Sequence, residues 1–118
     1  MLFRSTTNSA GTLSVGSSSA LGTGTLTMNG GTLGVTGGGG WTLTNAVTLS
    51  ANSVADTGGG NLTLGGTISG TGSLNKGNNN NTLTIAGTYA ATGDLWVGYG
   101  TLNFSGTQTG GEIGRAHV

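Results

Sequence analysis

Only a few side chains in this sequence could do acid–base, nucleophilic or metal chemistry. The carboxylates are Asp56, Asp94 and Glu112, the single histidine is His117, and cysteine is absent. Two carboxylates share one reaction only when both come within hydrogen-bond reach of a substrate. Asp56 and Asp94 are 38 positions apart, and we interpret them as solvated turn residues. We predict no catalytic, metal or cofactor site in this chain, since one histidine on a tail cannot supply three or four metal ligands.

Basic residues are equally scarce. Lys76 is the only one outside the two ends of the chain, and we interpret it as a solubilising charge on an outer turn. The formal net charge is zero and only 5% of the residues are charged. The electrostatic footprint of a nucleic-acid partner is therefore missing. The glycine runs contain no G-x-x-x-x-G-K-[ST] phosphate loop.

Aromatic side chains are the remaining candidates for contact with a ligand. Four of them could form a sugar-stacking or adhesive surface: Trp41, Tyr89, Trp96 and Tyr99. In a strand over residues 94–97, Trp96 points away from the side taken by Leu95 and Val97, and hence outward. Trp96 and Tyr99 are thus the candidate contact residues, because exposed aromatics often mark contact sites. The alternative is packing against a loop or a neighbouring coil.

The elements that must position these residues are short strands. Gly accounts for 27 of the 118 residues and Pro for none, while apolar residues alternate with Thr, Ser or Gly, which is typical of strands. One phrase occurs twice, as GTLTM at 24–28 and GTLGV at 31–35. We predict strands at 11–15, 24–28, 31–35, 41–44, 46–50, 61–64, 67–69, 72–76, 82–86, 88–90, 94–97 and 101–104. Residues 51–60 are expected to form a loop.

These strands are too short and too closely spaced for a sandwich, and self-similarity at this scale indicates a solenoid. We predict an all-β parallel β-helix without helices, with three strands per coil and roughly four or five coils. Leu, Val, Ile and Met would face inward, Thr, Ser and Asn outward, and Gly would occupy the corners.

The two ends differ in composition from the rest. LFRS at residues 2–5 and IGRAHV at 113–118 both resemble translated sequencing adapter. We therefore treat residues 1–5 and 112–118 as non-native tails and 6–111 as the repeat segment.

Several segments resemble the autotransporter-associated β-strand repeats found in passenger regions of bacterial type V secretion proteins. They are ALGTGTLT at 20–27, NAVTL at 45–49 and, above all, LTLGGTISGTGSLNK at 62–76. The stretch after Lys76 departs from the usual continuation of the family. The resemblance implies a right-handed parallel β-helix that is secreted or displayed on a Gram-negative cell. It implies a structural, non-enzymatic stalk segment of an adhesin. Its expected partners are adjoining coils, a C-terminal membrane barrel and a host-surface or carbohydrate ligand.

Two other function classes stay open. One is a carbohydrate-active β-helix protein, which would need Asp56 and Asp94 within catalytic reach of each other. The other is a small Thr-rich binding solenoid, because outward Thr-x-Thr pairs would stack into ladders like the flat arrays of ice-binding solenoids. These pairs are Thr25/Thr27, Thr42/Thr44 and Thr82/Thr84. Their irregular spacing along the chain argues against one continuous array.

Overall fold

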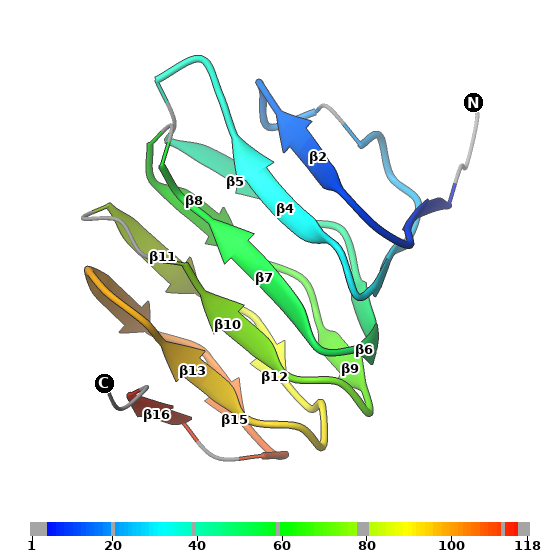
Figure 1. The fold of residues 1–118 in the computed structure, drawn as a ribbon, viewed down its shortest axis with the longest axis vertical. Helices are drawn as coiled ribbons and strands as arrows, with labels where there is room; N and C mark the ends of the chain where they lie inside the picture. Colours follow the sequence, from blue (N-terminus) through cyan, green and yellow to red (C-terminus); the bar gives the residue numbers. More distant parts are fainter. Residues whose placement is uncertain are drawn as a thin grey trace.

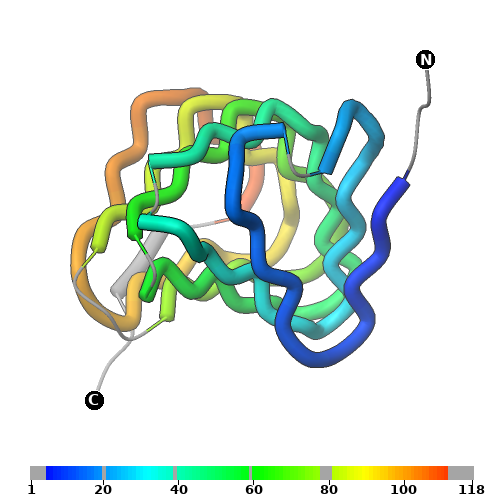
Figure 2. The backbone as a smooth tube through the Cα atoms, turned by 90° about the horizontal axis from the view of Figure 1, so that it is seen from above, coloured from blue at the N-terminus to red at the C-terminus, as the bar shows by residue number. Residues whose placement is uncertain are grey.

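The structure, a computed structural model, describes residues 5–19, 21–38, 40–58, 60–77, 81–111 and the backbone of 113–115. Within these ranges the chain forms parallel strands and turns and no helix. The strands wind into a β-solenoid of about 5 turns (Figure 1). Seen along its length, the backbone traces successive coils that lie over one another (Figure 2). The predicted fold class is thereby confirmed.

Three parallel sheets form the walls of the solenoid, and their strands alternate in chain order. Sheet A contains β1 (Thr6–Asn8), β3 (Leu26–Asn29), β6 (Val47–Ala51), β9 (Ile68–Gly70), β12 (Thr88–Tyr89) and β15 (Thr107–Gln108). Sheet B contains β2 (Thr12–Val15), β4 (Thr32–Val35), β7 (Ser53–Asp56), β10 (Leu74–Lys76), β13 (Leu95–Val97) and β16 (Ile113–Arg115). Sheet C contains β5 (Trp41–Leu43), β8 (Leu62–Leu64), β11 (Thr82–Ile85) and β14 (Thr101–Phe104).

The length of each coil is nearly constant. Residues that align along sheet A are, in order, Thr6, Leu26, Val47, Ile68, Tyr89 and Gln108. Each coil therefore has 19 to 21 residues, as the differences between these numbers give. Because the strands pair in parallel, equivalent residues of successive coils form columns that run along the solenoid.

The core is a set of such columns with their side chains inside the coil. In sheet A, Leu26, Val47, Ile68 and Tyr89 are all buried. Sheet C contributes two adjacent inward columns from β8 and β11: Leu62 and Leu83, and Leu64 and Ile85. Alternation along each strand places Thr, Ser or Asn between the buried residues, as the sequence predicts.

Glycine at one corner allows the coils to stack closely. Gly66, Gly87 and Gly106 occupy equivalent positions where the chain passes from sheet C to sheet A. A Cβ on Gly87 would collide with the carbonyl oxygen of Gly66, and one on Gly66 with that of Asn45. Asn45 takes this corner one coil earlier, and its buried side-chain amide donates to the carbonyl oxygen of Gly24 at 2.7 Å. At Gly66 and Gly87, where backbone lies directly against the backbone of the preceding coil, only a residue without a side chain fits.

The structure corrects the expected loop at 51–60. Residues 53–56 form β7, which pairs with both β4 and β10. Ser53 and Ala55 face inward and are buried, whereas Val54 is on the outward side. The strand was missed because its core-facing residues are small and partly polar.

Candidate functional site

The two candidate contact residues lie on and just after β13. Trp96 is half-buried on the outward side of sheet B, next to Asn75 of the preceding coil. Tyr99 lies in the following turn, and its side chain is 57% exposed. Leu95 is fully buried, so the outward direction predicted for Trp96 from strand parity is confirmed.

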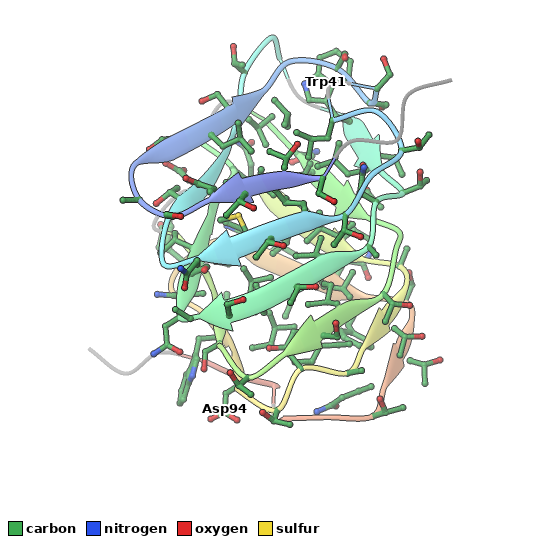
Figure 3. All side chains as sticks on the ribbon, turned by 90° about the vertical axis from the view of Figure 1, so that its right-hand side faces the viewer. Trp41 and Asp94 are labelled. Carbon is green, nitrogen blue, oxygen red and sulfur yellow. The ribbon has the colours of Figure 1, made fainter. Side chains whose placement is uncertain are left out.

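The other two aromatic residues do not share this surface. Tyr89 is fully buried in sheet A, and its hydroxyl donates to the carbonyl oxygen of Gly93 at 3.0 Å. Burial raises the pKa of Tyr89 to about 12. Trp41 lies in the inward column of sheet C beside Leu62 and packs against the core, near one end of the solenoid (Figure 3). Its indole Nε1 donates to the carbonyl oxygen of Thr36 at 2.7 Å. A surface built from all four aromatics is therefore wrong.

Lys76 is the residue whose environment differs most from expectation. It is fully buried, so its interpretation as a solubilising charge on an outer turn is wrong. Within β10, Leu74 and Lys76 point inward and Asn75 points outward. Lys76 therefore belongs to the inward column of sheet B, between Ala55 of the preceding coil and Val97 of the next. Strand parity, counted from the inward Leu74, is the sequence signal that would have indicated an inward Lys76.

The Lys76 ammonium reaches the turn of the next coil. Its Nζ donates a hydrogen bond of 2.8 Å to the carbonyl oxygen of Tyr99. Burial lowers the pKa of Lys76 below its usual 10.5, while the negative charge of Asp56 acts in the opposite direction. The small side chain of Ala55 in the neighbouring coil leaves space along the column for the lysine stem.

A cavity adjoins the same turn. Its volume is about 170 Å³, and it is lined by Val97, Gly98, Tyr99 and Gly100. This volume is below the ≈300–1,000 Å³ of typical ligand pockets. The cavity has room for a small chemical group or a few water molecules beside Tyr99. It is too small for an oligosaccharide.

The two aspartates lie at opposite ends of the strands of sheet B. Asp94 precedes β13 and aligns with Ser73 of the preceding coil. The backbone N–H of Asp94 donates a hydrogen bond of 3.1 Å to the Oγ of Ser73. Asp56 ends β7, two coils away. At ordinary sheet spacings their backbones are roughly 16 Å apart. The structure does not bring them together as an acid–base pair, and so offers no support for the carbohydrate-cleaving alternative.

The remaining residues with ionisable side chains near the C-terminal end are Glu112, Arg115 and His117. Glu112 and His117 are outside the described residues, and Arg115 is described only as part of the backbone of β16. Within the described part of the chain no three His, Cys, Asp or Glu residues come together in a way that could hold a metal ion. Among the same residues there is no helix of the length and apolar character needed to span a membrane.

Comparison with known proteins gave no match. No protein-family model, no curated protein and no solved structure is significantly similar to this chain.

Proposed function

We propose that the chain is a structural segment of a bacterial autotransporter passenger, a β-solenoid stalk that is secreted or displayed at the surface of a Gram-negative cell. Its role is mechanical: stacked coils carry adhesive loops or a tip away from the outer membrane. Adjoining coils and a C-terminal membrane barrel belong to the same protein. Adhesion is directed at a host surface or a carbohydrate.

The observation that carries this proposal is the continuity of the columns. Each wall repeats with coils of 19 to 21 residues, and the buried apolar residues of successive coils form one continuous core. A protein of this kind gains length by adding coils and needs no further domain for its core. The resemblance of residues 62–76 to the passenger repeats then supports the cellular setting.

The scarcity of charge is compatible with the same role. Within the described residues, Asp56, Lys76 and Asp94 are the only charged side chains whose surroundings the structure gives. Trp96 and Tyr99, on the outward side of sheet B and the adjoining turn, are the residues we propose for surface contact.

Two experiments test this proposal. In the first, the source DNA is sequenced outward from both ends of the region that encodes this chain, so that the full reading frame is known. We expect further repeats of the same period and a terminal segment of membrane-barrel strands; a frame without either would contradict the proposal.

The second experiment tests display directly. Antibodies raised against the folded chain are applied to intact and to permeabilised source cells, with an antibody to a cytosolic protein as the control. We expect labelling of intact cells or of protein in the medium. Labelling that requires permeabilisation would refute the surface location.

A further inference from the structure

The outward side of sheet A carries two parallel columns of hydroxyl side chains, which we call the threonine face. One column consists of Thr7, Thr27, Thr48, Ser69, Ala90 and Thr109. The other consists of Thr25, Ala46, Thr67, Thr88 and Thr107. All but two of these positions carry a hydroxyl group. Figure 3 shows sheet A face-on, with its strands lying side by side from the top of the view to the bottom.

The regularity of this face is hidden in the sequence. The pairs noticed there belong to different walls: Thr25 and Thr27 lie on sheet A, whereas Thr42 and Thr84 lie on sheet C. Along the chain, the intervals vary because the corners differ in length. Strand pairing removes this variation, since Thr7, Thr27 and Thr48 align directly across β1, β3 and β6. The irregular spacing is therefore no argument against a continuous array.

The geometry of the threonine face is a two-dimensional lattice. Neighbouring coils are about 4.8 Å apart, and residues i and i+2 of one strand about 6.6 Å apart. Threonine is branched at Cβ, so each side chain is largely restricted in χ1 and its methyl and hydroxyl groups keep fixed positions. Little rotamer entropy is lost when such a surface meets another ordered surface.

The composition of the face limits what it can bind. Neither column contains a charged or an aromatic residue. Flexible sugar chains and proteins are commonly held by aromatic stacking or charge. Among the described residues, the exposed aromatic side chain is that of Tyr99, in the turn after β13 of sheet B. An electrically neutral, rigid array of hydroxyl and methyl groups instead fits a neutral surface that is itself periodic in two dimensions and made of hydrogen-bonding oxygens.

We propose that the threonine face adsorbs to ice. The hydroxyl groups take places near oxygen positions of the ice surface, and the methyl groups hold the waters between the columns in order. Each contact is weak, but the contacts along the columns form together, so adsorption is cooperative. This activity does not depend on the stalk function. It would give the protein an inorganic ligand, ice, in addition to its structural role.

The experiment measures recrystallisation of ice in a frozen sucrose solution with the full 118-residue chain. We expect grain growth to be inhibited by the wild-type chain. Thr48→Lys, at the centre of the face, should weaken inhibition at least about tenfold, because a solvated charge cannot be accommodated against the lattice. Thr63→Lys is the matched control: Thr63 is equally half-buried, but lies on sheet C between Thr42 and Thr84.

Circular dichroism establishes whether each variant is folded. If Thr48→Lys does not fold, Thr67→Lys takes its place, because Thr67 is an exposed position of the same face. Loss of inhibition in the sheet A variant alone would support the proposal. An inactive wild-type chain, or equal losses in the sheet A and sheet C variants, would overturn it. Binding of the wild-type chain to insoluble cellulose or chitin but not to ice would overturn it as well and would favour a polysaccharide ligand.

Discussion

The ammonium group of Lys76 in one coil is hydrogen-bonded to the carbonyl oxygen of Tyr99 in the next, at 2.8 Å. A fully buried cation thus connects two successive coils from within the core. The same turn presents the most exposed aromatic side chain of the described residues. This hydrogen bond therefore joins the interior of sheet B to the turn that carries Tyr99, one of the two candidate contact residues.

Replacing Lys76 should separate the contribution of its stem from that of its charge. Lys76→Ala removes a buried four-carbon chain and is expected to cost about 2–5 kcal/mol of unfolding free energy. Lys76→Met keeps most of the packing and removes a desolvated charge, so its loss should be clearly smaller. Urea unfolding of both variants measures the difference. Equal losses would contradict a packing role for the stem.

Lys76 should also make stability depend on pH. Burial lowers its pKa in the folded chain below the value of 10.5 in the unfolded chain. Between these two pKa values the unfolded chain binds more protons, so the free energy of unfolding should rise as the pH rises. Urea unfolding at several alkaline pH values below 10 tests this rise. The slope should be absent in Lys76→Met, and a wild-type slope that persists in this variant would assign it to another group.

Tyr89 should act in the opposite direction at higher pH. Its pKa is raised from 10.0 to about 12, so the folded chain keeps its proton longer than the unfolded chain does. Below pH 10 Tyr89 is protonated in both states, and its contribution to the free energy of unfolding is fully present. As the pH rises toward 12, the free energy of unfolding should fall by an amount on the order of 2 kcal/mol. Tyr89→Phe should lose this dependence, at the cost of the hydrogen bond to Gly93, about 1 kcal/mol at neutral pH. A decline above pH 10 that is unchanged in Tyr89→Phe would exclude Tyr89 as its source.

Two adjacent glycines provide a test of close coil stacking. A Cβ on Gly66 would collide with the backbone at Asn45, whereas one on Gly65 would make only ordinary contacts, the nearest at 3.7 Å. Gly66→Ala should therefore lower the midpoint of thermal unfolding by several degrees or prevent folding. Gly65→Ala should change it little or raise it, because it restricts the unfolded chain. The stacking argument fails if the two variants are equally stable.

Tyr99 contributes to stability through its backbone and not through its ring. The side chain is largely exposed, and the carbonyl oxygen that Lys76 contacts remains in any substitution. Tyr99→Ala should change the free energy of unfolding by no more than about 0.5 kcal/mol. Chemical denaturation measures it, with Leu95→Ala as a buried reference in the same segment. A loss comparable to that of Leu95→Ala would show that the ring packs in solution.

Alternation of apolar and polar residues was enough to predict most strands, the parallel solenoid and the outward direction of Trp96. It failed at Ser53–Asp56, where the inward residues are small and the β-branched Val54 points outward. Alignment with the neighbouring coil would have found this strand, since Val54 lies one coil before Asn75.

The error at Lys76 has a different physical origin. Residue type favours an exposed lysine, because an isolated buried charge is costly. Its strand parity favours the interior, and the carbonyl oxygen that makes the interior acceptable belongs to Tyr99, 23 residues further on. Local sequence cannot supply such a partner. The threonine face was missed for a similar reason: it exists only after coils of unequal length have been paired.

The nearly constant coil length has a consequence for how the gene can change. Duplication or loss of a DNA segment that encodes one whole coil returns every column to alignment, because the strands on either side meet equivalent partners. An insertion or loss of one codon inside a strand would instead exchange inward and outward residues from that point to the next corner. Recombination between similar repeats can therefore alter the length of this protein in whole coils, while small insertions are confined to the corners.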